Sequence, residues 1–322
     1  MTLPGSQQMM GAREDLEVRH GRDHRSRGAP EGLRAHRGGG RISFTVNRAE
    51  IFGILGPNGA GKTTAVETVA GLRSPDAGRL RVLGLDPQRQ GPELRQRLGL
   101  QLQQAALPER IKVWEALELF SSFYRHPLDW RQLLEEWGLG EKCNAAFAGL
   151  SGGQRQRLFI ALALVGDPEL VILDELTAGL DPQARRATWE LVAAIRDAGT
   201  TVVLVTHFMD EAERLCDRLA IIDDGRIVAQ GAPAELIRPL STESQVRFTA
   251  AAGFDAAWLE GVAGVSRVVS EGHQVVVHGT GPLMARVATA LADRDLAAAD
   301  LRSEQATLED VFLALTGRRL RD

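Results

Sequence analysis

The chain has 322 residues, enough to bury the core of one large domain and one small domain. A hydrophobic content of 44%, a charged content of 25% and a net charge of −4 are ordinary for a globular protein, and they give no reason to expect a nucleic acid or an anionic membrane as partner. Cys143 and Cys216 are far apart and outside any ligand spacing, which argues against a zinc site or a disulfide framework, and no apolar run reaches the roughly 18 residues that cross a bilayer. We therefore expect a cytoplasmic protein.

Residues 1–41 differ in composition from the rest of the chain. They are rich in Arg, Gly and His and hold few large apolar side chains. Because such a segment buries too little apolar surface to offset the conformational entropy lost on folding, residues 1–41 are predicted to be disordered or irregular. Three of the seven histidines, His20, His24 and His36, lie here. A metal-binding or RNA-binding tail is the alternative interpretation of this segment.

From Ile42 onward the pattern is that of an α/β protein. The runs "ISFTV" and "EIFGILG" predict strands, and the second ends at a glycine turn that leads into the predicted helix "KTTAVETVAGL". Further strands are expected in "RLRVLG", "LGLQLQ", 169–174 and 200–207. Further helices are expected near 112–124, 130–138, 152–165 and 183–198. A hairpin is expected over 218–231, with its turn at Asp224-Gly225. Near-continuous apolar strands alternating with helices predict a mostly parallel sheet covered on both faces, in a domain over 42–238.

The composition shifts again near Leu240. The runs from "SQVRFTA" to "TLEDVFLALTG" predict the order β-α-β-β-α-β-α, with "FDAAWLEGV" as the first helix. This order predicts a small α+β, ferredoxin-like appendix over 239–322 that carries no catalytic motif.

A complete phosphate-binding motif, G-x-x-x-x-G-K-[ST], covers Gly56 to Thr63. It stands between a predicted strand and a predicted helix, where glycines let backbone N–H groups approach phosphates and the helix dipole adds to the attraction. Lys62 is expected to reach the β- and γ-phosphates and Thr63 to ligate Mg²⁺. The sequence therefore predicts a nucleoside triphosphate site.

Two adjacent carboxylates follow the apolar run "LVIL". Asp174 is predicted to hold Mg²⁺ at the strand end, and Glu175 to orient or deprotonate the attacking water. His207 follows a second apolar strand and is predicted to contact the γ-phosphate. The turn "LSGGQ" at 150–154 places a serine and two glycines at a predicted helix start, which is a second way to bind phosphate.

Taken together, these motifs resemble those of ATP-binding-cassette (ABC) ATPase subunits over roughly residues 42–235. The resemblance implies a P-loop fold with a helical subdomain that carries "LSGGQ", the signature, and an aspartate, Asp181, in the D-loop "AGLD". It also implies a Q-loop glutamine. We assign Gln103 over its neighbours Gln101 and Gln104 because it ends the predicted strand.

The resemblance assigns three overlapping sets of residues. It implies that ATP contacts the two glycine-rich turns and the D-loop: Gly56, Pro57, Asn58, Gly59, Ala60, Gly61, Lys62, Thr63, Thr64, Ser151, Gly152, Gly153, Gln154 and Asp181. It implies that catalysis depends on Glu175, His207, Lys62 and Gln103, and that Mg²⁺ is held by Thr63, Gln103 and Asp174.

The resemblance also implies a function and partners. ATP hydrolysis to ADP and phosphate would power a separate membrane permease, at the inner face of the cell membrane, with a second cassette paired head-to-tail. "LPERIKVWEALELFSSFY" and "TLEDVFLALTG" resemble the ABC-2-type, daunorubicin-resistance-like exporter branch. No nucleic acid is expected as partner. The alternatives are a soluble ABC-class ATPase that acts on nucleic acid or ribosomes, and a weakly active regulatory cassette.

The sequence departs from the family pattern at three places. Leu176 stands where Pro is usual, and Ala49 where a turn often has Gly, which predicts backbone strain. The family also places an aromatic residue before the first strands to stack on adenine, but no Phe, Tyr or Trp precedes Phe44. His20 or His36 could substitute. The loss predicts weaker ATP affinity, by about 1–3 kcal/mol if base stacking elsewhere is a guide, and weak base selectivity.

Overall fold

The computed structural model describes residues 16–19, 42–103, 105–240, 244–251, 254–294, 296, 298–304 and 306–317. The chain divides into two compact units, Met1–Gln230 and Gly231–Asp322.

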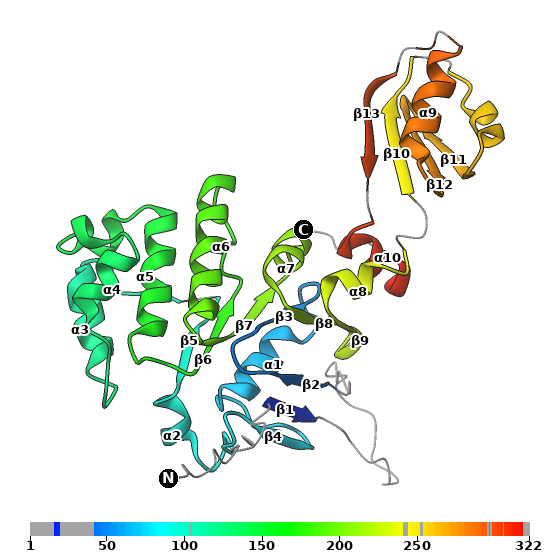
Figure 1. Ribbon diagram of the computed structural model, residues 1–322. Helices are drawn as coiled ribbons and strands as arrows, with labels where there is room; N and C mark the ends of the chain where they lie inside the picture. The colour runs from blue at the N-terminus through cyan, green and yellow to red at the C-terminus, as the bar shows by residue number, and fades with distance from the viewer. Residues whose placement is uncertain are drawn as a thin grey trace, which may run out of the picture. The chain divides into compact units, whose positions relative to one another are not determined.

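The first unit is built on a mostly parallel six-stranded sheet with the strand order β5-β6-β7-β3-β8-β9 (Figure 1). In that order the strands are β5 Leu98–Gln101, β6 Leu170–Asp174, β7 Thr201–Thr206, β3 Ile51–Leu55, β8 Arg218–Asp223 and β9 Arg226–Gly231. Every residue of β3, β6 and β7 is buried, which explains why these strands are continuous apolar runs.

The strand register brings the functional loops to one edge of this sheet. Leu55 pairs with Thr206, and Asp174 pairs with Val205, in parallel ladders. Because β3, β6 and β7 point the same way, the segments that follow them leave the sheet at the same edge. The phosphate loop, the carboxylate pair and the histidine therefore start side by side.

The helices of this unit match the sequence expectations closely, with two additions. They are α1 Lys62–Val69, α2 Gly91–Arg95, α3 Val113–Ser121, α4 Trp130–Glu136, α5 Gly152–Leu164, α6 Pro182–Asp197 and α7 Met209–Leu215. Short 3₁₀ turns occupy Gly140–Lys142 and Phe147–Gly149. Helix α3 packs against α4 and α5, forming the helical subdomain that carries the signature turn (Figure 1). Helices α2 and α7 were not expected from the sequence.

A second, three-stranded antiparallel sheet corrects one expectation about residues 1–41. Its order is β2-β1-β4, with β2 Ser43–Val46, β1 Leu16–Arg19 and β4 Arg79–Arg81. The β1 segment was expected to be irregular, but it forms the central strand because it supplies both neighbours with a backbone ladder. The rest of 1–41, with His20, His24 and His36, lies outside the described residues.

Backbone strain at Ala49 is confirmed. Its φ is 53°, in the left-handed region that disfavours a Cβ, and its N–H donates to Thr201 Oγ1 at 3.0 Å. The hairpin turn is confirmed as well, since Asp224 and Gly225 have φ values of 46° and 71°, as a type I′ turn requires.

The second unit contains a four-stranded antiparallel sheet with the order β11-β12-β10-β13. Its elements are α8 Pro233–Ile237, β10 Ser244–Thr249, β11 Val265–Glu271, β12 Gln274–Gly279, α9 Leu283–Ala292, β13 Ala299–Glu304 and α10 Leu308–Thr316. The connection from β10 to β11 holds a 3₁₀ segment, Ala257–Gly261, where we expected an α-helix. The core of this sheet packs Phe248, Val277 and Leu283 together.

Candidate functional site

The phosphate loop joins β3 to α1 and wraps around Lys62. Lys62 begins α1, is only 5% exposed, and its Nζ donates to the carbonyl oxygens of Gly56 at 2.7 Å and Pro57 at 3.2 Å. Gly59 and Gly61 have φ values of 81° and 102°, which side chains rarely adopt. Asn58 and Gly59 are exposed, and so are Thr63 and Thr64 in the first turn of α1. A backbone loop at a helix start with an enclosed ammonium group fits a polyphosphate.

Gly56 is required by close packing. A Cβ at this position would lie 2.2 Å from the carbonyl oxygen of Ile222 in β8. Ala60, in the same loop, is buried at 3% exposed. The loop is therefore held tightly against the sheet from which it emerges.

The carboxylate pair lies at the end of β6 beside this loop. Asp174 is 2% exposed, and burial raises the pKa of its carboxyl to about 6, with the neighbouring Glu175 adding to the rise and Lys62 opposing it. Burial also lowers the pKa of Lys62, against the opposing effect of both carboxylates. A divalent cation at Asp174 would favour the ionised carboxylate in the same way as Lys62 does.

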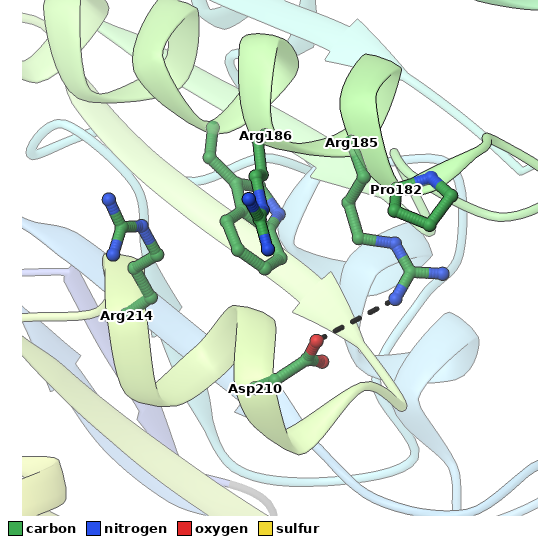
Figure 2. A pocket seen from close by; sticks show the side chains of 6 residues that line it. Pro182, Arg185, Arg186, Asp210 and Arg214 are labelled. Carbon is green, nitrogen blue, oxygen red and sulfur yellow. Dashed lines mark ion pairs between the residues drawn. The ribbon is translucent and has the colours of Figure 1, made fainter.

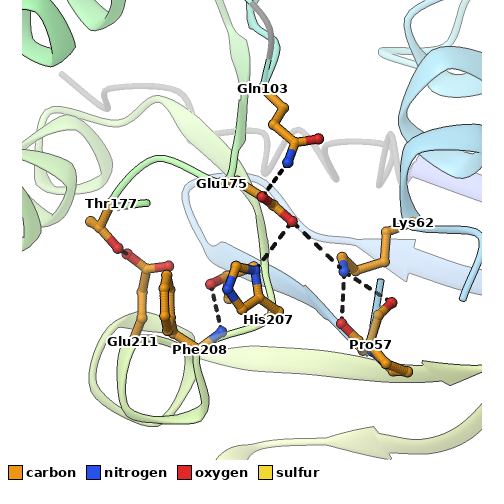
Figure 3. Close-up of polar contacts among 10 residues, drawn as sticks. Pro57, Lys62, Gln103, Glu175, Thr177, His207, Phe208 and Glu211 are labelled. Carbon is orange, nitrogen blue, oxygen red and sulfur yellow. Dashed lines mark hydrogen bonds and ion pairs between the residues drawn. The ribbon is translucent and has the colours of Figure 1, made fainter. Parts of the chain in front are cut away.

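The carboxylate of Glu175 contacts three other residues of the candidate site. Its Oε1 lies 3.2 Å from His207 Nδ1 and 4.0 Å from Lys62 Nζ, and its Oε2 accepts a hydrogen bond from Gln103 Nε2 (Figure 3). The side chain of Glu175 is 7% exposed, whereas that of His207 is 20% exposed. Three residues that were predicted separately from the sequence therefore converge on the carboxylate of a fourth, where a water could be oriented or deprotonated.

The geometry distinguishes Gln103 from its neighbour Gln101. Gln101 is buried in β5 at 5% exposed, and its side-chain amide donates to the carbonyl oxygen of Leu102. We expected Gln103 to end this strand, but β5 ends at Gln101, and Gln103 lies in the segment beyond it, where it contacts Glu175. Gln104 lies outside the described residues.

The signature turn is assembled separately from the phosphate loop. Ser151 caps α5, with its Oγ accepting from the Gln154 N–H and its own N–H donating to Gln154 Oε1, so these residues form a capping box. Ser151 and Gly152 are exposed, and a Cβ at Gly153 would lie 3.6 Å from the Ala184 Cβ. Within the described residues, no hydrogen bond or ion pair links this turn to the phosphate loop of its own chain.

The D-loop aspartate has a structural role in this conformation. Asp181 caps α6, and its Oδ1 accepts from the N–H groups of Gln183 at 3.0 Å and Ala184 at 2.9 Å. These hydrogen bonds fix the start of α6 beside the signature turn, since Ala184 also faces Gly153.

The sequence analysis missed a buried network next to the site. Glu211 on α7 is fully buried and accepts a hydrogen bond from Thr177 Oγ1 at 2.9 Å (Figure 3). The same carboxylate accepts a hydrogen bond from Trp189 Nε1 at 3.0 Å. The run "MDEAERL" contains helix-forming residues and could have predicted α7. Nothing local in the sequence marks Glu211 as buried.

The outer side of the same helices is basic. A hollow of about 470 Å³ between α6 and α7 is lined by Pro182, Arg185, Arg186, Trp189, Asp210 and Arg214 (Figure 2). Arg185 pairs with Asp210 at 3.6 Å and lies over the Phe208 ring at 4.4 Å. These contacts hold α6 against α7 from the solvent side.

Phe44 does not supply an adenine platform in this structure. It is 3% exposed and stacks on Phe52, with 5.2 Å between ring centroids and 13° between the ring planes. The substitutes considered, His20 and His36, lie outside the described residues.

Comparison with known proteins places the chain in a family. The ABC transporter family model matches residues 40–178. A Nod factor export ATP-binding protein I of Ralstonia nicotianae is 38% identical over 87% of this chain and 89% of its own length. The corresponding protein of Burkholderia lata is 40% identical over 87% of this chain and 92% of its own length.

Solved structures show the same similarity. An ATP-binding subunit of an ABC transporter, 29% identical, covers 62% of this chain and 85% of its own, with a TM-score of 0.57. The cbiO1 protein of Clostridium perfringens, described as part of the ABC transporter complex cbiONQ, is 27% identical and covers 65% of this chain and 91% of its own, with a TM-score of 0.55. Within the described parts of the chain, no helix is long and apolar enough to span a membrane. By its motifs, its fold and its relatives, the chain belongs to the ABC transporter family, among the cassettes that bind and hydrolyse ATP.

Proposed function

We propose that this chain is the ATP-hydrolysing subunit of an ABC-2-type exporter and that it powers a separate membrane permease. The convergence of Gln103, His207 and Lys62 on Glu175 carries the proposal, because this arrangement suits hydrolysis as well as binding. The relatives named as export ATP-binding proteins support export. They give no support to the alternative of a cassette that acts on nucleic acid.

Each residue of the site has a role in the proposed reaction. The backbone of Gly56–Thr63 and the Lys62 ammonium bind the β- and γ-phosphates, and Glu175 orients the attacking water and accepts its proton. His207 holds the Glu175 carboxylate and faces the γ-phosphate, while Gln103 holds the other carboxylate oxygen. The charge that develops on the γ-phosphate is stabilised by the Lys62 ammonium and the loop amides.

We propose Mg²⁺ as the metal cofactor, held by Thr63, Asp174 and Gln103. A hydroxyl, a carboxylate and an amide oxygen are the hard ligands that Mg²⁺ prefers, and the metal would neutralise phosphate charge. The buried Asp174, with its raised pKa, is the ligand whose ionisation a cation would favour most.

The signature turn points to a site shared by two chains. Ser151 and the first signature glycine are exposed, and the turn makes no polar contact with the phosphate loop of its own chain within the described residues. In a head-to-tail pair, residues Ser151–Gln154 of one chain would cover the ATP held by the phosphate loop of the other, with Asp181 nearby. We infer a homodimer, because one chain carries the full motif set.

The permease would bring the paired cassettes to the inner face of the cell membrane and would recognise the transported molecule. The C-terminal residues 239–322 are proposed as an accessory domain beside an ATPase domain over 42–238. Identification of a membrane protein that co-purifies with this chain would test the transport role.

The hydrolytic role is tested by phosphate release from ATP and Mg²⁺ by the purified chain. We expect Glu175→Gln to lower kcat by about 10²–10⁴-fold, the usual range for a general base, without weakening nucleotide binding. Glu190→Gln, the same change at an exposed position of α6, should leave the rate unchanged. Equal rates for wild type and Glu175→Gln would refute the assignment of the base.

A further inference from the structure

Glu211 is a fully buried carboxyl that the reaction above does not use. It lies on α7, and burial raises its pKa, while hydrogen bonds from Thr177 and Trp189 oppose the rise. A buried carboxyl is costly unless hydrogen bonds satisfy it. The positions of its two donors, Thr177 and Trp189, therefore show what this residue holds together.

The two donors lie on segments around the hydrolytic residues, and Glu211 itself lies on α7, the helix that follows His207. Thr177 lies two residues after Glu175, and its hydroxyl donates to Glu211 Oε1 at 2.9 Å. Thr206 immediately precedes His207 at the end of β7. Trp189 belongs to α6, and its indole N–H donates to the same Glu211 oxygen at 3.0 Å. One side chain thus joins the segments that carry Glu175 and His207 to a long helix.

The backbone at Glu175 needs such an anchor. Its φ of 50° is unfavourable for a residue with a Cβ and persists only when its surroundings hold it. Leu176 and Thr177 follow it, both fully buried. Thr177 supplies the polar contact that fixes this segment, and Glu211 is its partner.

A second set of contacts restrains the backbone around His207. The Phe208 N–H donates to Thr206 Oγ1 at 3.0 Å, so this hydrogen bond joins the two residues that flank His207. On the solvent side, Arg185 covers Phe208 and pairs with Asp210, which holds α7 in place. The backbone around His207 is therefore held at the start of α7, the helix that carries Glu211.

We propose that Glu211 is a positioning residue for ATP hydrolysis. By accepting a hydrogen bond from Thr177, it ties the Glu175 segment to the helix that follows His207 and so holds Glu175 and His207 at their contact distance. The inference rests on the proposed function and deepens it. The Glu175 Oε1 to His207 Nδ1 separation of 3.2 Å is the geometry at stake. A displacement of about 1 Å at a reacting group is enough to lower a rate by around 100-fold.

The test uses variants of the full-length chain with matched controls. Thr177→Val keeps the side-chain shape and removes the hydroxyl, and we expect kcat to fall at least roughly tenfold because Glu175 loses its anchor. KM for ATP and Kd for nucleotide should stay within about twofold, since the phosphate loop is untouched. Thr188→Val is the control, because Thr188 is equally buried on α6 but donates to the Ala184 carbonyl oxygen. It should leave kcat unchanged.

Variants of Glu211 test whether hydrogen bonding or charge matters. Glu211→Gln keeps the Oε1 acceptor for Thr177 and Trp189, so it should retain at least about a third of the wild-type kcat. Glu211→Ala should lose activity at least as strongly as Thr177→Val. Adding Thr177→Val to Glu211→Ala should cause little further loss, because the two side chains act through one contact.

Rates are normalised to the folded fraction, measured by circular dichroism, so that lost stability is not counted as lost catalysis. The proposal is overturned if Thr177→Val keeps the wild-type kcat, if Thr188→Val loses as much, or if Glu211→Gln is as impaired as Glu211→Ala. A wild-type protein without ATPase activity would instead refute the proposed function. The two failures are therefore distinguishable.

Discussion

The two glycine-rich turns of this cassette both open a helix, but they are built in different ways. At Gly56–Thr63 the loop encloses a buried lysine, which lies 4.0 Å from the hydrolytic glutamate of the same chain. At Ser151–Gln154 the turn is capped by its own glutamine and begins with exposed residues. The first turn has its chemical partners within the chain, whereas the second presents its donors outward. The difference suggests that a single chain can hold ATP but needs a second chain to hydrolyse it.

The largest expected effect comes from changing the second turn. Ser151→Arg places a long cation where the signature would meet ATP of the partner chain, so we expect hydrolysis to fall by at least ~100-fold, comparable to losing a main stabilising contact. Binding of nucleotide to the monomer should stay nearly intact, as measured by titration with a fluorescent ATP analogue. Ser122→Arg, an exposed serine at the end of α3, is the control. Survival of activity in Ser151→Arg would refute the two-chain site.

A smaller effect is expected at the glutamine beside Glu175. Gln103→Ala removes a hydrogen bond to the catalytic carboxylate, and we expect kcat to fall by roughly tenfold, because a hydrogen bond to a charged group contributes about 1.5–3 kcal/mol. Gln101→Leu should leave kcat unchanged, since the Gln101 side chain contacts the Leu102 carbonyl oxygen and not Glu175. If phosphate-release assays show a loss of activity in Gln101→Leu and none in Gln103→Ala, the Q-loop glutamine is Gln101.

The raised pKa of Asp174 predicts a pH dependence of stability in metal-free protein. Its folded pKa of about 6 exceeds the ordinary value of 3.8, so the folded state binds the proton more tightly than the unfolded state. The resulting stabilisation is present below about pH 4, is lost as pH rises to about 6, and is absent above. The Tm of wild type minus the Tm of Asp174→Asn should therefore decrease between pH 4 and pH 6 and stay constant above pH 6. A constant difference across this range would contradict the raised pKa.

The smallest expected effect concerns the base of the nucleotide. Because no aromatic residue precedes Phe44 and Phe44 itself is buried against Phe52, we expect the Kd values for ATP and GTP to lie close together. Stacking of a base on an aromatic side chain contributes about 1–3 kcal/mol, so restoring such a side chain should make the Kd values for ATP and GTP differ. Equilibrium titrations of wild type with both nucleotides provide the measurement. A strong preference for ATP would show that another residue reads adenine.

The parts of the fold that were predicted from the sequence are those with local signals. Apolar runs identified β3, β6 and β7, and the glycine pattern of the phosphate loop identified the start of α1. The strain at Ala49 also followed from a local comparison. These features depend on neighbours in the chain, which periodicity and turn chemistry record.

The features that were missed depend on distant partners. Leu16–Arg19 form a strand only because β2 and β4 lie on either side. In the sequence, Glu211 is one of several charged residues in the run that forms α7. In the fold, Thr177 and Trp189 donate hydrogen bonds to its carboxylate. In the second unit, Ala257–Gly261 form a 3₁₀ segment although the run favours an α-helix, so tertiary packing overrides local propensity there.

The central claim, a hydrolytic site completed by a second chain, is tested most directly by the oligomeric state of Glu175→Gln in the presence of ATP and Mg²⁺. Size-exclusion chromatography with light scattering gives the mass. We expect Glu175→Gln to be a monomer without nucleotide and a dimer with ATP, because blocked hydrolysis preserves the ATP that joins the two chains. The double variant Glu175→Gln/Ser151→Arg should bind ATP and remain a monomer. Dimerisation of the double variant, or an ATP-loaded Glu175→Gln that stays a monomer, would contradict the claim.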